Sequence, residues 1–582
     1  MMAATTTTRT TMLVTTSRSS PPGRSSTSRR RAPASSRGGV QVQAPPRHAS
    51  RPGASVGRRD GRAPGRVRAS AAAEEIPESE LSIVETPFVG LKRDLKQRLP
   101  FYVSDYTEGL NLKCLASTLF MFFACLAPAV AFGSLLNVKT QGAMGALEML
   151  VSTSICGMVY ALFSGQPVTI IGSTGPVLAF TAIMYSTCQQ MALPFLSTYA
   201  WVGLWTSGIL GLCAVTSTSN LVIRYLTRFT DEIFAGLISV IFVVEAMKNI
   251  VSLLFNSGVS SSAALLSIMT AISTCAFALS LAGLRSSSYF NKKARDLVAN
   301  FGPTISIVAC TIACTWLATR YGIGLEYLTL PSQIAPSTPR PWVVSLMDTP
   351  VWARWASSLP AVMVSILMFF DQNITTRLVN SKDNKMKKGY GYHVDLLIVA
   401  ANTLVFSMLG MPWLVAATVR SVNHLKSLTT FEDVKEGDVE TTKVVGVTET
   451  RVTNFAIHAC IGASVLYARD LLAKIPQCVL MGLFLYLGLS AIKGNEFLER
   501  IELFFMDKKK MPKVPYVTDI SLGATKKFTL LQIASLLALV ALKESKYGIL
   551  FPVVIAALQI ILVLAVRAKW FTEKEIAVLD RE

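Results

Sequence analysis

Apolar runs of membrane length recur along most of this chain, and they constrain its fold more than any other feature. A helix needs about 20 apolar residues to cross the hydrocarbon core of a bilayer. Of the 582 residues, 51% are hydrophobic and only 16% are charged, whereas soluble domains carry about 25% charged residues. The sequence therefore predicts an all-α polytopic membrane protein.

The apolar runs predict about fourteen transmembrane segments in two sets of seven, separated by a polar, proline-containing stretch near 320–356. Seven plus seven favours two inverted repeats. The segments are expected near 112–134, 143–164, 168–186, 197–217, 229–255, 263–284 and 297–318, and then near 358–379, 393–410, 412–427, 449–469, 476–492, 527–544 and 547–567.

Lys and Arg gather in three short connections, at 285–295, 377–388 and 508–510. Positively charged loops mark the cytoplasmic side of a membrane protein. With fourteen crossings, all three connections fall on the same side as both chain ends, so the segment count and the charges agree.

The N-terminal stretch 1–73 has the composition of an organelle transit peptide. It holds fourteen Arg and one Asp, a net charge of +13 within the +20 of the chain. No aromatic side chain interleaves these arginines, so a base-stacking surface for nucleic acid is absent. In Arg66-Val-Arg-Ala-Ser-Ala71 small residues follow an arginine cluster, which resembles a chloroplast processing site and favours a chloroplast leader. A mitochondrial leader and a plain disordered tail remain alternatives.

These features predict how the chain is divided, with the membrane repeats between two polar ends. The expected parts are a disordered leader at 1–73, a basic amphipathic pre-membrane segment at 74–110, a first seven-segment repeat at 111–318, a connecting loop at 319–356, a second repeat at 357–568 and a tail at 569–582. The expected location is the chloroplast envelope, with the plasma membrane as the alternative.

The third run of each half is short and is broken by Gly and Pro where it opens, at Gly165–Phe180 and Gly410–Val422. Paired interruptions at matching places indicate a transporter's binding site near the membrane midplane. Each run is expected to be extended first and helical afterwards, from Gly175–Pro176 and from Ala417–Thr418. Free N–H groups at helix starts bind anions. The predicted substrate site comprises Ser173, Thr174, Gly175, Pro176, Ala417, Thr418 and Arg420.

Asp371 interrupts the apolar run Ser358–Val379, and a carboxylate at membrane depth usually marks a function. Thr375 follows four residues later, on the same helix face. Two such oxygens suit a hard cation, so Asp371 and Thr375 are predicted to hold a coupling Na⁺ or to act as a charge or proton switch. Arg420 offers a fork for a planar oxyanion. A purely structural carboxylate, or an Arg420 that only pairs with Asp371, remains an alternative.

The remaining intramembrane charges are interpreted as structural. Glu148 lies near a segment end, and Glu245 is expected to pair with Lys248, three residues on. The chain shows no nucleophile–base arrangement, nucleotide loop or paired-carboxylate motif, so neither an enzyme nor a cofactor other than Na⁺ is predicted.

Several motifs resemble solute carrier family four, the bicarbonate transporter, anion exchanger and boron transporter family. The similarity is specific and covers about 88–580, the transport domain only. The motifs are Pro100-Phe-Tyr-Val-Ser-Asp105, Gly165-Gln-Pro, Ser173-Thr-Gly-Pro-Val177, Phe370-Asp-Gln-Asn-Ile-Thr375, Lys387-Lys-Gly-Tyr-Gly-Tyr-His-Val-Asp-Leu396, Met411-Pro-Trp413 and Ala417-Thr-Val-Arg-Ser421.

The resemblance implies fourteen segments in two inverted repeats, a core and a gate domain, and a homodimer. It looks closest to the sodium-coupled branch, which has Asp at the place of Asp371 and whose ion site involves the places of Asp371, Thr375 and Thr418. Arg420 instead resembles the exchangers, so Na⁺ coupling and chloride exchange both stay open.

Together these inferences predict secondary active transport of an inorganic anion, bicarbonate in the first place, by alternating access. Borate export is the alternative within the class. A membrane anchor or scaffold without transport is the alternative outside it.

Overall fold

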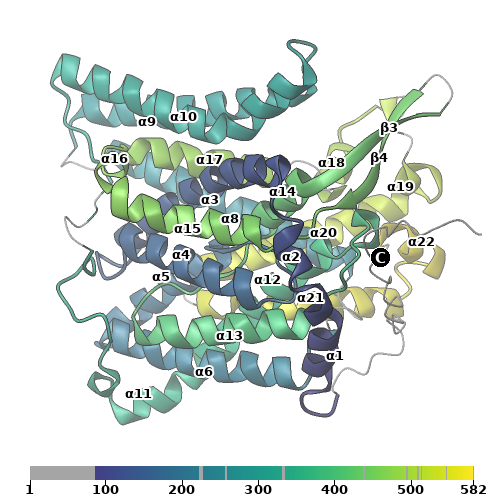
Figure 1. The fold of residues 1–582 in the computed structure, drawn as a ribbon, viewed down its shortest axis with the longest axis horizontal. Helices are drawn as coiled ribbons and strands as arrows, with labels where there is room; N and C mark the ends of the chain where they lie inside the picture. The colour runs from purple at the N-terminus through teal and green to yellow at the C-terminus, as the bar shows by residue number, and fades with distance from the viewer. Residues whose placement is uncertain are drawn as a thin grey trace, which may run out of the picture. The chain divides into compact units, whose positions relative to one another are not determined.

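The structure, a computed structural model, describes residues 85–580 apart from 222–226, 256–258, 329, 331–333, 437–438, 493–495, 508–509, 513 and 546. The predicted leader at 1–73 lies outside these residues. The described chain is built almost wholly from helices (Figure 1).

Eight helices in the described part of the chain are long and apolar enough to cross a membrane. Four shorter apolar helices accompany them. The long helices are α3 (Leu112–Lys139), α4 (Ala146–Phe163), α6 (Phe195–Val215), α8 (Arg228–Phe255), α9 (Ser261–Gly283), α10 (Lys292–Tyr321), α11 with α12 (Val351–Ala356, Ser358–Val379) and α20 (Leu522–Glu544), and the shorter ones are α13 (Tyr392–Met408), α15 (Val452–Tyr467), α17 (Gln477–Ile492) and α21 (Phe551–Arg567).

The two interrupted runs form a short strand followed by a helix, as the sequence predicts. Strand β1 (Ile171–Gly172) precedes α5 (Gly175–Gln190), and strand β2 (Val415–Ala416) precedes α14 (Thr418–Leu428). Each of the fourteen expected segments therefore coincides with a helix or a strand–helix unit of the described chain.

The helices pack in two groups. One group contains α3, α4, α6, α12, α13 and α15, and the other contains α8, α9, α10, α17, α20 and α21. In Figure 1, α6 and α13 lie at the lower edge and α9 and α10 at the upper edge. Helix α3 contacts both groups, and α5 lies between α3, α6, α8 and α12.

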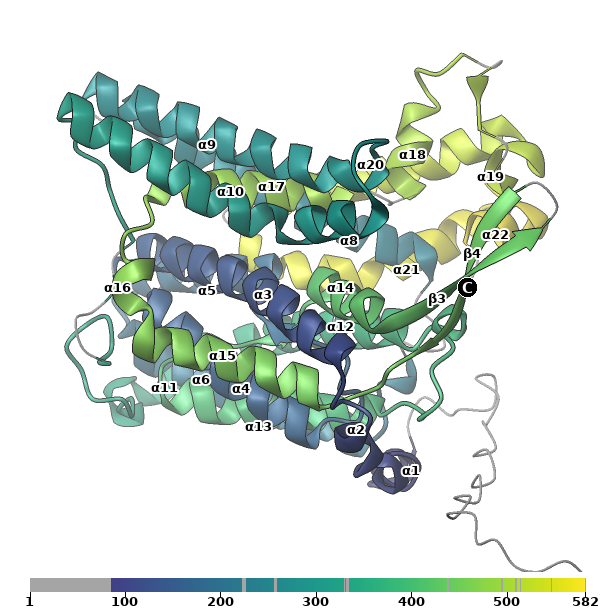
Figure 2. The same ribbon diagram turned by 45° about the horizontal axis from the view of Figure 1, so that its top comes forward.

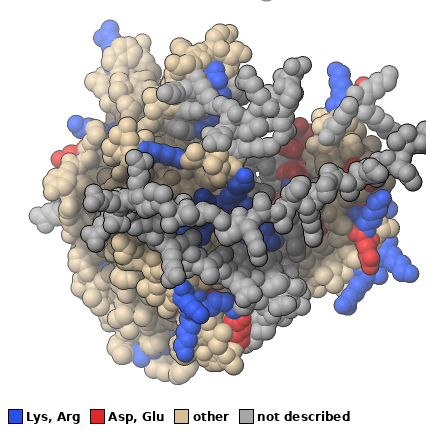
Figure 3. Space-filling view, turned by 45° about the vertical axis from the view of Figure 1, so that its right-hand side comes forward, with Lys and Arg blue, Asp and Glu red and all other residues tan. Residues whose placement is uncertain are grey.

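The helix bundle has two distinct ends. Helices α11 and α16 (Arg469–Leu472) lie at one end, whereas α1 (Val89–Arg98), α22 (Glu573–Leu579) and the hairpin of β3 (Thr429–Glu436) and β4 (Val439–Val447) lie at the other (Figures 1 and 2). Lys and Arg are prominent on the described part of this second end (Figure 3). We call it the basic end. The hairpin was not anticipated from the sequence.

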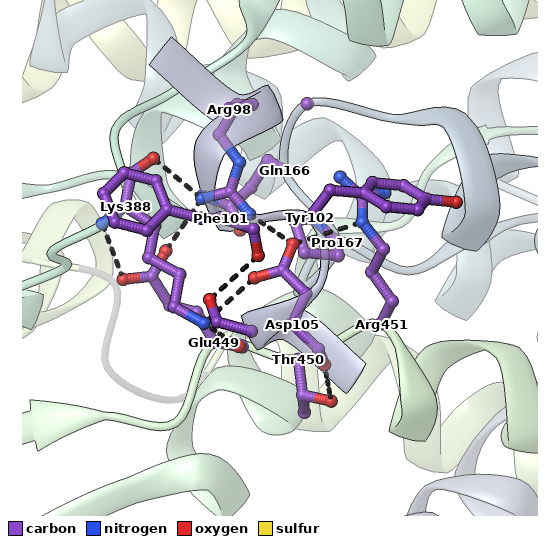
Figure 4. A network of polar contacts seen from close by, with 12 residues as sticks. Arg98, Phe101, Tyr102, Asp105, Gln166, Pro167, Lys388, Glu449, Thr450 and Arg451 are labelled. Atoms are coloured by element: carbon purple, nitrogen blue, oxygen red, sulfur yellow. Dashed lines mark hydrogen bonds and ion pairs between the residues drawn. The ribbon is translucent and has the colours of Figure 1, made fainter. Parts of the chain in front are cut away.

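A buried network of charges holds the pre-membrane segment against the bundle at the basic end (Figure 4). The Asp105 carboxylate, in α2 (Ser104–Thr107), accepts from Arg98 (3.0 Å), Lys388 (3.0 Å) and Arg451 (3.1 Å). Glu449 also accepts from Arg98 (3.1 Å). All five side chains are at most 8% exposed. Burial strengthens the attraction between opposite charges and raises the free-energy cost of a charge without a partner. Loss of one member of this network therefore destabilises the others.

Helix α1 also caps α13. Asp94 accepts hydrogen bonds from the backbone N–H groups of His393 (2.7 Å) and Val394 (3.2 Å) at the start of that helix. Burial raises the pKa of the Asp94 carboxyl to about 8, against the lowering effect of those two N–H groups.

The predicted pairing of Glu245 with Lys248 is wrong. Glu245 instead bonds Lys139 of α3 (2.9 Å) and Lys543 of α20 (3.5 Å), and Lys248 pairs with Glu544. Spacing along α8 can predict only partners within that helix, whereas the partners of Glu245 come from two neighbouring helices. Glu148 has the expected structural role, because it accepts from the backbone of Gly145 (2.9 Å) at the start of α4.

Replacement of Asp105 by Asn should destabilise the protein by about 3–5 kcal/mol, because it removes the negative charge that three buried cations share and leaves Arg451 without a carboxylate partner among the described residues. The measurement is thermal unfolding of the full chain in detergent. Asp348→Asn, at an exposed aspartate, is the matched control and should change stability by less than about 0.5 kcal/mol. Equal effects of the two substitutions would show that the network does not hold the segment.

Candidate functional site

The two interrupted segments meet in the middle of the bundle. Strands β1 and β2 pair antiparallel, with Ile171 opposite Ala416 and Gly172 opposite Val415. The N–H of Ala417 donates to the carbonyl of Ile170 (2.8 Å). This pairing satisfies the non-helical backbone and brings the starts of α5 and α14 together, so that two positive helix ends face one region.

A cavity of about 300 Å³ lies at these helix starts, and we call it the midplane cavity. Other walls come from α3, α8, α9, α10 and α17, and from Arg285 after α9. The predicted site residues that line it are Ser173, Thr174, Gly175, Asp371, Ala417, Thr418 and Arg420. Pro176 and Thr375 are not among its lining residues. The structure thus brings together seven residues that lie on three separate segments of the chain.

Asp371 lines this cavity and has a carboxylate oxygen without a partner among the described residues. Its Oδ2 accepts a hydrogen bond from the Thr174 hydroxyl (2.9 Å), and its Oδ1 has no partner within the described chain. The side chain is 1% exposed. A buried carboxylate oxygen that lacks a donor is costly unless a cation or a proton meets it, so this geometry fits a hard cation.

Thr375 reaches the cavity only through a second threonine. Its hydroxyl lies 2.7 Å from that of Thr418, which lines the cavity at the first turn of α14. The hydroxyl that bonds the Asp371 carboxylate is thus that of Thr174 and not that of Thr375. Spacing along one helix could not indicate Thr174, because it lies on another segment of the chain.

Arg420 enters the cavity from the first turn of α14. Its Nη2 donates to the Ser173 carbonyl, whereas its Nη1 and the Ser173 hydroxyl have no partner among the described residues. Among the residues that the structure describes, no ion pair joins Arg420 to Asp371. An arginine and a serine with unpartnered donors thus line one small cavity together with two helix starts, an arrangement that suits an anion.

Gly172 leaves the space that the Arg420 guanidinium occupies. A Cβ atom on residue 172 would lie 2.4 Å from Arg420 Nη1 and 2.7 Å from Arg420 Cζ. Atoms cannot approach so closely, so any other residue there would displace Arg420. Sequence patterns did not identify this position, and only the β1–β2 pairing reveals it.

Polar side chains behind the cavity hold the extended segment 167–171 and strand β2, a role that no sequence pattern indicated. Helices α14, α15 and α12 supply them. The hydrogen bonds run from Asn454 Nδ2 to the carbonyls of Pro167 (2.9 Å) and Thr169 (2.8 Å), between His424 Nδ1 and the Val168 carbonyl (2.7 Å), between His458 Nε2 and the Ile171 carbonyl (3.2 Å), and from the Ala416 N–H to Gln372 Oε1 (3.1 Å).

Comparison with known families finds one match over most of the chain. The model of the HCO₃⁻ transporter integral membrane domain matches residues 86–262 and 256–582. A sodium-driven chloride bicarbonate exchanger of Bos taurus is 35% identical over 565 residues, which covers 85% of this chain and 50% of the relative. Sodium bicarbonate cotransporter 3 of Rattus norvegicus is 36% identical over 563 residues, which covers 85% and 46%. The chain spans about half the length of these relatives.

Solved structures with a similar fold share little sequence with this chain. The transmembrane domain of a cyanobacterium bicarbonate transporter, BicA, has a TM-score of 0.51 at 15% identity and covers 77% of this chain and 98% of its own. Murine solute carrier 26 family member A9, in the inward-facing state, has a TM-score of 0.53 at 12% identity and covers 87% of this chain and 74% of its own. These likenesses concern the fold.

Gly172→Ala should lower stability by about 1–3 kcal/mol, because the added methyl group overlaps the Arg420 guanidinium. In an Arg420→Ala background the same change should have little effect, since the space is then empty. A double-mutant cycle on unfolding of the full chain measures this coupling.

The control is Gly208→Ala in α6, where no atom lies within 4 Å of an added Cβ. An equal loss from Gly172→Ala with and without Arg420 would contradict the assignment.

Proposed function

This chain belongs to the HCO₃⁻ transporter family, and from that premise we propose that it transports bicarbonate across a membrane by secondary active, alternating-access transport. The observation that carries the proposal is the convergence of two helix starts, Arg420 and the free oxygen of Asp371 on one cavity. No catalytic step is part of this function.

The anion would lie between the helix starts and the guanidinium. Bicarbonate is a planar oxyanion, and Arg420 Nη1, the Ser173 hydroxyl and the N–H groups at the start of α5 and α14 offer donors from several directions. The proposed substrate residues remain Ser173, Thr174, Gly175, Pro176, Ala417, Thr418 and Arg420, and Gly172 is added as the residue that positions Arg420.

Charge in the cavity favours a companion cation. An ionised Asp371 would repel an anion in the same small space, where water screens poorly. Na⁺ bound at Asp371 Oδ1 removes this repulsion, so that cation and anion load together. Thr174 and the Thr375–Thr418 pair supply neighbouring hydroxyl oxygens. Chloride exchange is the second candidate, because Arg420 can hold an anion without a cation.

The proposed architecture is fourteen membrane segments in two inverted repeats that form a core and a gate domain. The matching strand–helix units at β1–α5 and β2–α14 support it. The first helix group would be the core and the second the gate, and the assembly would be a homodimer. The proposed divisions are the leader at 1–73, the pre-membrane segment at 74–110, the repeats at 111–318 and 357–568, the loop at 319–356 and the tail at 569–582.

Two alternatives use the same fold. A borate exporter would place tetrahedral borate at the same helix starts. A membrane anchor or scaffold would leave the cavity without a role.

Uptake of labelled bicarbonate into vesicles that hold the full chain should rise with an inward Na⁺ gradient. Asp371→Asn should abolish the stimulation by Na⁺. Arg420→Ala should raise the bicarbonate concentration for half-maximal uptake about tenfold or more, since a hydrogen bond to a charged group contributes about 1.5–3 kcal/mol.

Asp348→Asn and Arg567→Ala, at exposed positions, are the matched controls and should leave uptake unchanged. Uptake that ignores Na⁺ but follows internal chloride would replace symport by exchange. Flux of boron without bicarbonate flux would favour the borate exporter. Full activity of both site variants would favour the scaffold.

For the location we propose the chloroplast envelope, with the plasma membrane as the alternative. A fluorescent reporter fused behind residues 1–73 should enter plastids of a photosynthetic cell and should lose the leader, because arginine-rich, acid-poor leaders are imported into organelles. Removing the leader from the fusion is the control. A reporter that stays in the cytosol or enters mitochondria would contradict the plastid assignment.

A further inference from the structure

A second cavity, of about 230 Å³, lies behind α5, and we call it the far cavity. Its walls come from α3, α5, α8, α17 and α20. Three of its lining residues also line the midplane cavity, namely Phe132, Gly175 and Phe242. The two cavities therefore meet at the start of α5, where the proposed anion site lies.

Three aromatic rings close the boundary between the cavities. The ring centroids of Phe132 lie 5.4 Å from Phe242 and 5.3 Å from Phe484, and those of Phe242 and Phe484 lie 6.1 Å apart. Gly175 allows this close packing, because a Cβ there would lie 3.3 Å from the Phe242 ring. The partition is one layer of side chains thick, and it joins α3 of the first helix group to α8 and α17 of the second.

One wall of the far cavity carries a row of small side chains that runs to the surface, flanked by Leu178 and Ile183 of the same helix. Gly175, Ala179, Ala182 and Ser186 of α5 line it at intervals of one helical turn. Ala179 is 6% exposed, whereas Ser186 is exposed. Small side chains in a row offer little resistance to a neighbouring helix that slides past them.

The cavities approach opposite ends of the bundle. Arg285 and Ser490 line the midplane cavity, and α9 and α17 end near them. Lys139, Glu245 and Lys543 line the far cavity; Lys139 and Lys543 lie at the C-terminal ends of α3 and α20, and Glu245 lies in the C-terminal half of α8. Helices α3 and α8 begin at the basic end, beside α2 and beside Asp580, which accepts from the Phe229 N–H (2.8 Å). Their C-terminal ends therefore lie at the other end.

A chain of ion pairs crosses the mouth of the far cavity. Glu245 bonds both Lys139 (2.9 Å) and Lys543 (3.5 Å), and Lys543 also bonds Glu544 (2.9 Å), which pairs with Lys248. Glu245 is 13% exposed and Lys543 7%. The Lys139–Glu245 pair links α3 to α8, and so it ties the two helix groups together at this mouth.

We propose that the far cavity is the second vestibule of the anion path, closed here by the Phe132–Phe242–Phe484 partition and locked by the ion pairs of Glu245. This inference rests on the proposed alternating access. When the first helix group moves against the second, the Lys139–Glu245 pair breaks and the rings part. The start of α5 then faces the far end, while the approach past Arg285 and Ser490 closes.

Labelling of single introduced cysteines tests this mechanism. Ala179→Cys reports on the far cavity and Ser490→Cys on the midplane cavity. Each is made in the full chain, in sealed vesicles, and treated with a membrane-impermeant thiol reagent from either side. Labelling of the parent chain, which has ten cysteines, is subtracted. Without further changes, the thiol introduced at position 490 should react from the basic end, and the thiol introduced at position 179 should react slowly from the far end.

Glu245→Gln should then speed the labelling at position 179 about three- to tenfold and slow that at position 490, because loss of the lock shifts the population toward the far-open state. Lys139→Gln breaks the same pair from the other helix and should do the same. The control is Glu85→Gln, which removes an ion pair with Arg93 (2.9 Å) away from this mouth, and it should change neither rate.

Unchanged labelling at position 179 in both lock variants would overturn the proposal. Faster labelling at both positions would also overturn it, because that pattern indicates general loosening and not a switch between two states. The readout requires no bicarbonate flux. If labelling becomes faster at position 179 and slower at position 490 but the chain takes up no bicarbonate, the proposed substrate is refuted and the proposed gate stands.

Discussion

Two segments of non-helical backbone lie in the middle of the helix bundle, and each depends on the other for its hydrogen bonds. Within a bilayer such backbone is tolerated only where protein satisfies it. The β1–β2 pair does so, together with Asn454, His424 and His458 behind it. The rest of the site follows from this constraint, because the pair fixes where α5 and α14 begin and how their N-termini face each other.

The same pairing places opposite charges around one cavity. Arg420 passes over Gly172 to the Ser173 carbonyl, and Asp371 approaches from α12 and bonds Thr174. Each charged group keeps one polar atom without a protein partner among the described residues. A site that leaves both an anion donor and a cation acceptor free is suited to loading an anion and a cation together.

Local patterns in the sequence predict much of this fold, and contacts between distant residues account for what they miss. Hydropathy predicts where the apolar helices lie, and Gly and Pro locate the two breaks, because both signals act within one helix. The Asp105 network joins residues separated by up to 351 positions, and no spacing rule connects them. Glu245 shows the same limit, since its partners come from α3 and α20. Gly172 is recognisable only once Arg420 is in place.

The central claim is that Asp371 and Arg420 hold a cation and an anion in one cavity. An experimental structure of the full chain in sodium bicarbonate, compared with one in a salt of a large organic cation and anion, tests it most directly. We expect density for a cation at Asp371 Oδ1 and for a planar anion between Ser173 and Arg420 Nη1, both present only with sodium bicarbonate. Identical density in the two salts, or ions bound away from these atoms, would contradict the account.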